Sequence, residues 1–263
     1  MSDVDLRYEA AAERRARILS TLRAVGFVSI AELARELRVS HMTIRRDLHT
    51  LEGAGDLRLV HGGASLNPGA RGAAFPDEAH TKAQKRVAGR AASLVGATDT
   101  IAIDAGPTAY ALARALPEDF GGCVITHSMP VIQLLAERMG ATRLVALGGE
   151  LLGDRRAFVG PTTEAAVDQL RARTFFVSPF AIDSRGTYAR SLAEASVERR
   201  LMEIADEVVL ISTPEAFTRS APARVAPLDR LTALVAGPWV PPDVATALKR
   251  AAVTLHVVPG ADC

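Results

Sequence analysis

Residues 40–64, SHMTIRRDLHTLEGAGDLRLVHGGA, constrain the fold of this chain more than any other stretch. Ile44, Leu48 and Leu51 recur at i, i+4 and i+7, so one stripe of a helix is apolar. Ser40 stands where the N-cap of that helix belongs. The opposite face carries arginine, histidine and threonine side chains, which can reach phosphates and base edges in the major groove of DNA. The residues predicted to contact DNA from this helix are Ser40, His41, Met42, Thr43, Arg45, Arg46, His49 and Thr50.

The flanking segments predict a winged helix-turn-helix. Residues 11–24 and 29–40 each carry apolar side chains on one side, which predicts two helices before the recognition helix. The segment DLRLVHGGA alternates apolar and polar residues and can turn at its glycine pair, so it predicts a β wing. Arg58 and His61 of this wing are further predicted DNA contacts. The order of these elements predicts a DNA-binding domain over residues 1–64.

The two adjacent arginines also allow a second interpretation. Exposed arginines are common on helices, and Arg45 or Arg46 could pair with Asp47 or Glu52 inside the domain. Removing the arginine would then lower stability instead of DNA affinity.

The segment AELARELRVSHMTIRRDLHTLEGAGDLRLVHGGA resembles the signature of the DeoR family of bacterial transcription regulators. The similarity is dense over residues 14–64. It implies that the DNA-contacting helix includes Ser40, Thr43, Arg45 and Arg46, and that the wing includes His61, Gly62 and Gly63.

Composition sets further bounds. With 263 residues, 48% of them hydrophobic, the chain can form one small domain and one of medium size. The formal net charge is only +1, so any attraction to DNA must come from the local placement of cations. Cys123 and Cys263 give no disulfide framework, and no apolar run reaches the roughly 18 residues of a membrane span. We therefore expect a cytoplasmic protein that does not enter a membrane.

The remainder of the chain predicts a linker and a larger second domain. Residues 65–79 are rich in glycine, proline and alanine and predict the linker. Over residues 80–263, helical patterns alternate with short apolar strands, which predicts an α/β domain with a mainly parallel sheet.

Ligands of parallel sheets bind beyond the carboxyl ends of the strands. Three predicted strands end here in small and polar residues, although the same residue types also serve as helix caps. The candidate effector-binding residues at these ends are Asp104, Gly106, Pro107, Thr108, Thr126, His127, Ser128, Gly148, Gly149 and Glu150.

The resemblance to the DeoR family continues in DAGPT, ITHS and LGGEL, and covers about residues 14–240. It implies a sensor domain with a fold like sugar-phosphate isomerases, which binds a phosphorylated sugar or a related metabolite. The sequence departs from the family at Pro107, His127 and Glu198, where threonine, asparagine and lysine are usual. The segment STPEAF, with Glu215, lacks the acid and the lysine of the family's Asp-x-Ser-Lys. Arginines that could replace this charge are Arg155, Arg156, Arg185, Arg190 and Arg219.

Together these features predict a sequence-specific transcriptional regulator, a repressor whose operator binding responds to a small sugar-derived metabolite. The expected partners are double-stranded operator DNA and the effector. We expect a homodimer or a higher homo-oligomer, because one small reading head buries too little surface for tight specific binding.

Two alternatives remain open. One is a ligand-independent, oligomerising regulator with a decayed pocket. The other is a sugar-phosphate isomerase, which needs an acid and a base at the strand ends, commonly a carboxylate with a lysine. Asp104 and Glu150 could supply carboxylates, but Lys82, Lys85 and Lys249, the three lysines, do not follow predicted strands. No Walker loop, G-x-G-x-x-G, metal-spaced Cys/His set or G-x-S-x-G occurs, so we predict no catalytic residue, cofactor or metal site.

Overall fold

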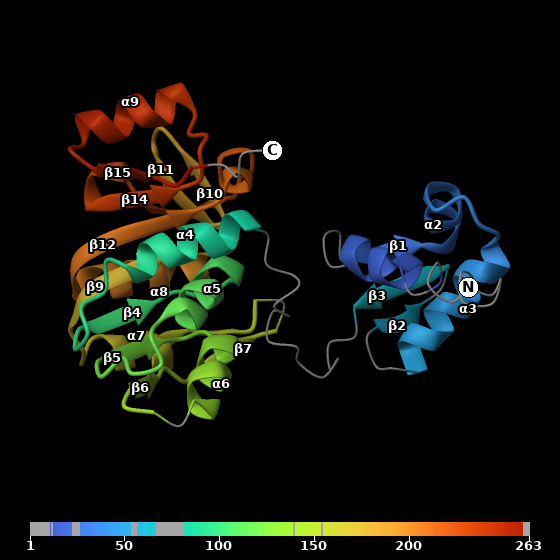
Figure 1. Cartoon of the computed structure of the whole chain (residues 1–263), viewed down its shortest axis with the longest axis horizontal. Coiled ribbons are helices and arrows are strands. Elements are labelled where there is room, and N and C mark those ends of the chain that lie inside the picture. Colours follow the sequence, from blue (N-terminus) through green and yellow to red (C-terminus); the bar gives the residue numbers. More distant parts are fainter. Residues whose placement is uncertain are drawn as a thin grey trace. The chain divides into compact units, whose positions relative to one another are not determined.

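A computed structural model describes residues 11, 13–22, 27–53, 57–60, 62–66, 82–138, 140–153 and 155–259. The chain splits into two compact units, residues 1–73 and 74–263 (Figure 1). Each unit has a hydrophobic core of its own.

The first unit is a winged helix-turn-helix, as the sequence predicts. A helix over residues 13–22 is followed by β1 (Phe27–Ser29), α2 (Ile30–Glu36), α3 (His41–Gly53), β2 (Leu57–Val60) and β3 (Gly63–Leu66). The strands form an antiparallel sheet in the order β1-β3-β2, to which β1 adds a strand that the sequence did not predict. Because β3 extends through Leu66, its last two residues fall in the stretch expected as a linker. Residues 67–79 of that stretch lie outside the described part of the chain.

The helices of this unit pack around the predicted apolar stripe. Ile44, Leu48 and Leu51 of α3 are buried among apolar side chains of the preceding helices and the wing. At the start of α2, the Ser29 hydroxyl accepts a hydrogen bond of 3.1 Å from the Glu32 backbone N–H. The Glu32 carboxylate in turn accepts one of 3.4 Å from the Ser29 backbone N–H, and this capping box determines where α2 begins.

A buried ion pair joins the first helix to α3. Asp47 lies on the buried side of α3, and its Oδ2 atom accepts a hydrogen bond of 2.6 Å from Arg14 Nε. We expect Asp47→Ala to lower the free energy of unfolding of this unit by about 2–3 kcal/mol, because the partly buried guanidinium loses its partner. Amide hydrogen exchange in α3 measures the change, and a double-mutant cycle with Arg14→Ala isolates the pair. Unchanged protection in Asp47→Ala would show that solvent screens the pair.

The second unit is built on a seven-stranded sheet in which all neighbouring strands are parallel. Its strands are β4 (Thr100–Ile103), β5 (Cys123–Thr126), β6 (Arg143–Ala146), β9 (Ala172–Val177), β12 (Ala205–Ser212), β14 (Ala233–Ala236) and β15 (Thr254–Val257). Their order is β15-β14-β12-β9-β4-β5-β6. After β4 the chain builds outwards through β5 and β6, and then returns to add β9 on the other side of β4. The junction of β4 and β9 is therefore the topological switch point, where ligands of such sheets bind.

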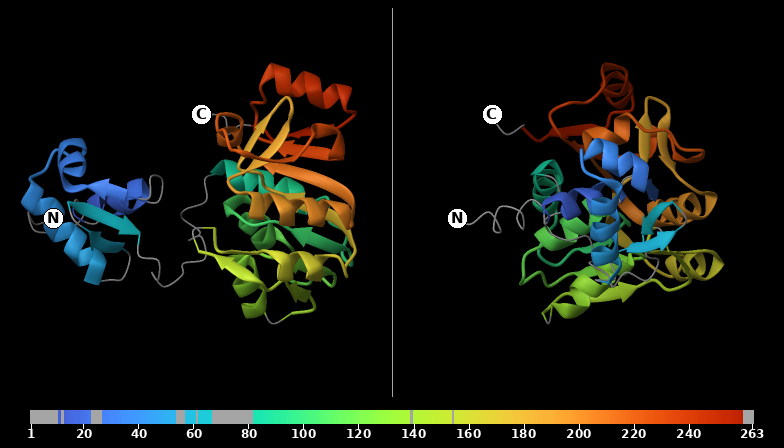
Figure 2. Two further views of the ribbon diagram at one scale, coloured as in Figure 1. Left: turned by 180° about the vertical axis from the view of Figure 1, so that it is seen from behind. Right: turned by 90° about the vertical axis from the view of Figure 1, so that its right-hand side faces the viewer.

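Helices cover both faces of this sheet, as expected for buried parallel strands. One face packs against α4 (Lys82–Ala92), α5 (Pro107–Ala115) and α6 (Met129–Glu137). The other face packs against α7 (Pro161–Val167), α8 (Leu192–Glu203) and α9 (Pro242–Arg250). Figure 1 shows α4 and α5 side by side on the first face, and Figure 2 shows the second face from behind. The predicted α/β domain with a parallel sheet is confirmed.

Short antiparallel elements complete the unit. A hairpin joins β7 (Glu150–Leu152) to β8 (Ala157–Val159), and a small sheet contains β10 (Ala181–Asp183), β11 (Gly186–Ala189) and β13 (Ala223–Ala226). Two 3-10 helices, η2 (Pro214–Phe217) and η3 (Leu228–Arg230), follow β12 and β13.

The apolar pattern of TFFVSPFAID, residues 174–183, predicts one strand, and this prediction is wrong. The structure divides it into the end of β9 and the whole of β10, with Ser178, Pro179 and Phe180 between them. Pro179 has no backbone N–H to donate to a central strand, which explains the break.

Candidate functional site

The exposed face of α3 carries the side chains that the sequence assigns to DNA. Ile44, Asp47, Leu48 and Leu51 are buried, and the opposite face of the helix is open to solvent. The assigned residues that the structure places in exposed positions are Ser40, His41, Met42, Arg45, Arg46, His49 and Thr50.

The hydroxyl groups on this helix also form local hydrogen bonds. Ser40 Oγ accepts a hydrogen bond of 3.1 Å from the backbone N–H of Thr43, which caps α3. The hydroxyls of Ser40 and the half-buried Thr43 lie 2.9 Å apart. Near the other end, Thr50 Oγ1 donates to the Arg46 carbonyl oxygen at 2.9 Å. The helix therefore fixes the orientation of these hydroxyls.

Arg45 and Arg46 have no ion pair within the residues that the structure describes. Asp47 pairs with Arg14, and Glu52 Oε1 accepts a hydrogen bond from a backbone N–H of β2. The internal pairing that the sequence left open is therefore not formed, and both guanidinium groups are available to a partner.

The wing contributes a further cation. Arg58 on β2 is exposed, and its Nε atom donates a hydrogen bond of 2.8 Å to Ser65 Oγ on the neighbouring β3. This contact anchors the guanidinium to the wing. His61 lies outside the described residues.

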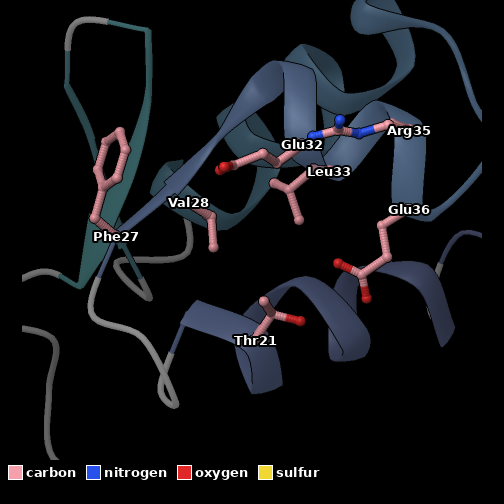
Figure 3. Close-up of a pocket in the computed structure, with 7 residues that line it drawn as sticks. All are labelled: Thr21, Phe27, Val28, Glu32, Leu33, Arg35 and Glu36. Carbon is pink, nitrogen blue, oxygen red and sulfur yellow. The ribbon is translucent and has the colours of Figure 1, made fainter.

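The first unit also has a groove, which is lined by residues of the first helix, β1 and α2 and by none of α3 (Figure 3). Glu32 and Glu36 of α2 bring two carboxylates to it, against one guanidinium from Arg35. The excess of negative charge in this groove disfavours contact with the DNA backbone, because phosphates are bound by cationic side chains. The full lining is Thr21, Phe27, Val28, Glu32, Leu33, Arg35 and Glu36.

In the second unit, three loops meet at one edge of the sheet. Asp104 follows β4, His127 follows β5, and Gly148 comes shortly after β6. Because these three strands are parallel neighbours, the loops converge, as the sequence predicts. Asp104, Gly106, Thr108, Thr126, His127 and Ser128 are buried, Pro107 is half-buried, and Gly148, Gly149 and Glu150 are exposed.

Asp104 connects three strand ends at this edge. Its Oδ1 atom accepts hydrogen bonds from the Ala105 backbone N–H at 2.7 Å and from His127 Nε2 at 3.1 Å. Its Oδ2 atom accepts one of 2.8 Å from the Ser178 backbone N–H. A carboxylate offers about four acceptor positions, so one position on Oδ2 remains for a ligand.

The His127 ring lies between two acceptors. Its Nε2 atom contacts Asp104 Oδ1, and its Nδ1 atom lies 2.9 Å from the Phe158 carbonyl oxygen. The ring therefore links the Asp104 carboxylate to the backbone of β8.

The two buried hydroxyls that follow β5 differ in their hydrogen bonding. Thr126 Oγ1 donates to the Ile103 carbonyl oxygen at 2.7 Å and accepts from the Ser128 backbone N–H at 3.1 Å. Thr126 therefore holds the loop. Ser128 Oγ is buried and has no hydrogen-bond partner within the described residues, so this hydroxyl can serve a ligand.

Gly106 lets the backbone come close to a ligand. Its φ of +124° favours glycine, and a Cβ atom there would meet only Arg155 Nη2 at 3.7 Å and Ser178 Oγ at 4.0 Å. Pro107 begins α5 directly afterwards, as predicted.

The structure adds Arg155, Glu194 and Ser178 to this edge. Arg155 Nε donates to Glu194 Oε1 at 2.5 Å, and Glu194 caps α8 by bonding to Ser191. The sequence offered Arg155 only as one of several arginines that could supply a positive charge. Ser178 was missed because the expected long strand concealed the end of β9.

Two further arginines lie on one aromatic ring. The guanidinium carbon atoms of Arg190 and Arg219 lie 4.5 Å and 5.2 Å from the centroid of the Phe180 ring. Phe180 follows β9 closely, and Arg219 follows η2 after β12. Cations held in this way by an aromatic face can bind an anionic group of a ligand.

Glu198 is a buried acid beside this edge. Burial raises the pKa of its carboxyl group well above the usual glutamate value, and the carboxylates of Asp104 and Glu194 raise it further. The carboxyl is therefore protonated over a pH range in which an exposed glutamate is ionised.

The raised pKa of Glu198 makes stability depend on pH. The stabilising contribution of the protonated acid is fully present below the unfolded-state pKa of about 4.5 and is lost as pH rises through the folded-state pKa. As pH rises between the unfolded-state and the folded-state pKa of Glu198, we expect the free energy of unfolding of the wild type to fall relative to that of Glu198→Gln. Chemical unfolding of both proteins at a series of pH values checks this. Parallel curves would contradict it.

Comparison with known proteins decides the family. Residues 14–68 match the DeoR-like helix-turn-helix domain, and residues 79–237 match the DeoR C-terminal sensor domain. The chain belongs to the DeoR family. This DeoR-family protein is a DNA-binding transcriptional regulator, and its relatives are named as transcriptional repressors and regulators.

Three relatives illustrate the match. This DeoR-family protein is 28% identical over 258 residues to a putative aga operon transcriptional repressor of Escherichia coli O157:H7, which covers 96% of each chain. It is 31% identical over 250 residues to the transcriptional regulator YgbI of Escherichia coli K12, covering 93% of this chain and 97% of that one. It is 29% identical over 231 residues to a lactose phosphotransferase system repressor of Streptococcus mutans, covering 85% and 90%.

Among solved structures, the DeoR-family chain is similar to ribose 5-phosphate isomerase A of Methanocaldococcus jannaschii. The identity is 18%, the coverage 48% of this chain and 50% of that one, and the TM-score 0.35. Within the described part of the chain, no helix has the length and apolar character needed to cross a membrane.

Proposed function

We propose that this DeoR-family regulator is a repressor whose operator binding is modulated by a small sugar-derived metabolite. The sensor is the carboxyl edge of the parallel sheet, and Asp104 is its central residue. The hydrogen bonds from Asp104 to the loops after β5 and β9 support this most strongly, because they form a polar site at the switch point. The relatives named as repressors of the aga operon and of the lactose phosphotransferase system support a sugar-derived effector.

In this proposal the effector lies against the loops after β4, β5 and β6. The open Oδ2 position of Asp104 accepts a hydroxyl, the Ser128 hydroxyl binds a second polar group, and the Gly106 backbone allows close approach. The remaining proposed contacts are Pro107, Thr108, Thr126, His127, Gly148, Gly149 and Glu150.

Operator recognition is assigned to α3 and the wing. Arg45 and Arg46 bind phosphates or guanine edges, and the remaining exposed residues of α3, with Arg58 and His61, complete the contact surface. We further propose a homodimer or higher oligomer in the cytoplasm, since two heads are needed to bury enough surface for specific binding.

Operator binding is expected to weaken as salt rises. Three exposed arginines, Arg45, Arg46 and Arg58, on each of two heads give a slope of about −5 in a plot of log affinity against log salt concentration. Fluorescence anisotropy with labelled operator at several salt concentrations measures this slope. Salt-independent affinity would indicate that the exposed face of α3 binds protein instead of DNA.

Selection of bound DNA from a random pool tests the proposed function and supplies the operator. A panel of sugars and sugar phosphates is then screened by thermal shift, and each compound that binds is added to the operator assay. A defined motif and a compound that changes its affinity are the expected results. A motif with no responsive compound favours the ligand-independent regulator, and the absence of any motif overturns DNA recognition.

A further inference from the structure

The sequence leaves open which arginines supply the positive charge that is missing at the family's lysine position. Arg155 Nε contacts the Glu194 carboxylate at 2.5 Å, and Arg185 Nη2 contacts the Asp183 carboxylate at 2.9 Å. Arg156 Nη2 donates to the amide oxygen of a glutamine on α6 at 3.2 Å. These three candidates are therefore held by polar partners of their own. The other two candidates share one aromatic ring.

Arg190 and Arg219 both lie on the ring of Phe180. Their guanidinium carbon atoms are 4.5 Å and 5.2 Å from its centroid. Because both carbons lie near one centroid, they are at most about 10 Å apart, close enough for one oxyanion to contact both after small side-chain rotations. Both arginines are exposed, and Phe180 is half-buried. We call these three side chains the arginine clamp.

The aromatic ring orients the two cations for binding. A guanidinium that stacks on a ring presents its N–H groups at its edge, where they can donate to an oxyanion. It also loses less side-chain freedom on binding than a guanidinium in open solvent. Arg219 has no ion pair within the residues that the structure describes, so no carboxylate of that part of the chain competes for it.

The clamp lies close to Asp104 through the end of β9. The Ser178 backbone N–H donates to Asp104 Oδ2 at 2.8 Å, and Phe180 comes two residues after Ser178. Two residues span at most roughly 7 Å, so Phe180 cannot be far from the Asp104 carboxylate.

A second set of contacts ties the clamp to the same edge through α8. Arg190 directly precedes Ser191, the N-cap of α8, whose backbone N–H donates to Glu194 Oε2 at 3.1 Å. The other oxygen of Glu194 contacts Arg155, and Arg155 Nη2 lies 3.7 Å from where a Cβ atom of Gly106 would be. The position of Arg190 is therefore connected to the loop after β4.

The strand order separates the clamp from Asp104 by a useful distance. Asp104, Phe180 and Arg219 follow β4, β9 and β12, which are successive neighbours in the sheet. Neighbouring strands lie about 4.8 Å apart, so these positions spread over about 10 Å of the carboxyl edge. A sugar with one terminal oxyanion has a comparable length. Its hydroxyls can reach Asp104 while its negative charge stays away from that carboxylate.

We propose that the arginine clamp binds a terminal oxyanion of the effector, either a phosphate or a carboxylate. This inference rests on the proposed function, which places a sugar at this edge of the sheet. Both kinds of oxyanion accept paired hydrogen bonds from guanidinium groups. Arg190 and Arg219 thus supply the charge that Glu215, at the family's lysine position, does not.

Isothermal titration of the full chain with matched sets of sugars tests the proposal. Each set contains a neutral sugar, its terminal phosphate and its terminal carboxylic acid, such as glucose, glucose 6-phosphate and glucuronate. The sets cover tetroses, pentoses and hexoses. In the set that binds most tightly, we expect one oxyanion form to bind about tenfold or more tightly than the neutral sugar. The tighter of the two oxyanion forms identifies the group as phosphate or carboxylate.

Arg219→Gln and Arg190→Gln should each lower the affinity for the oxyanion form by about tenfold and leave that for the neutral sugar within about twofold. If the arginines only cover Phe180, both variants would instead lower the melting temperature and keep the preference. Arg171→Gln is the matched control. Arg171 is an exposed arginine that precedes β9, at the opposite edge of the sheet, and its loss should change neither affinity.

The proposal is overturned if the neutral sugar binds as tightly as both oxyanion forms, or if either clamp variant keeps the full preference. In both cases the proposed sugar sensor survives. If no member of any set binds or alters operator affinity, the arginine clamp and the proposed function fail together.

Discussion

Replacing Arg46 with alanine is expected to weaken specific operator binding strongly while leaving the DNA-binding unit folded. Arg46 is exposed on α3, and it forms no ion pair in the described part of the chain whose loss would destabilise the fold. A bidentate contact to guanine contributes roughly 1–3 kcal/mol, so two heads lose roughly 2–6 kcal/mol, or about 30-fold to more than 10,000-fold in affinity. Anisotropy titration of the selected operator measures this loss.

The matched control for Arg46→Ala is Arg35→Ala. Arg35 is an exposed arginine of the same unit, but it lies on α2, where it lines the groove that also contains Glu32 and Glu36 (Figure 3). It should leave operator affinity within about twofold of the wild type. If Arg46→Ala retains operator affinity with an unchanged melting temperature, the assignment of the recognition face is wrong.

Replacing Asp104 with asparagine is expected to remove the effector response while preserving operator binding. An amide oxygen can replace only one of the two carboxylate oxygens, so the amide NH₂ would face either the Ser178 N–H or the Ala105 N–H and His127. Leaving a buried donor unsatisfied costs about 1–3 kcal/mol of stability at this edge. The lost hydrogen bond from an effector hydroxyl to the carboxylate lowers effector affinity by roughly tenfold or more. The variant should stay bound to its operator at effector concentrations that release the wild type.

The control for Asp104→Asn is Asp206→Asn, which alters an exposed ion pair with Arg171 on the same unit. This variant should respond to the effector as the wild type does, because exposed pairs contribute little. A normal response of Asp104→Asn would place the effector elsewhere in the molecule.

The sequence predicted the DNA-binding unit well because its signal is local. The spacing of Ile44, Leu48 and Leu51 identifies the buried face of α3, and the glycine pair identifies the wing turn. The burial of Asp47 was not predictable in this way. Its partner, Arg14, lies 33 positions earlier in the chain, and only the packing of the first helix against α3 brings the two together.

The candidate effector site was predictable only in part, for a related reason. Parallel strands bring their carboxyl ends to one edge, so Asp104 and His127 could be placed together from the strand pattern alone. The cations and acids around them come from the β7–β8 hairpin and α8, whose positions depend on tertiary packing. Glu198 could thus be recognised in the sequence as a departure from the family, but not as a buried carboxyl beside Asp104 and Glu194.

In the proposed mechanism, a sugar bound at the carboxyl edge of the sheet controls how tightly α3 holds the operator. This coupling is tested by the operator affinity of the wild type, measured by anisotropy with and without the sugar that binds the sensor. We predict a change of roughly 5- to 150-fold, the usual range of allosteric coupling. Operator affinity that stays the same at saturating sugar would show that the carboxyl edge of the sheet does not control α3.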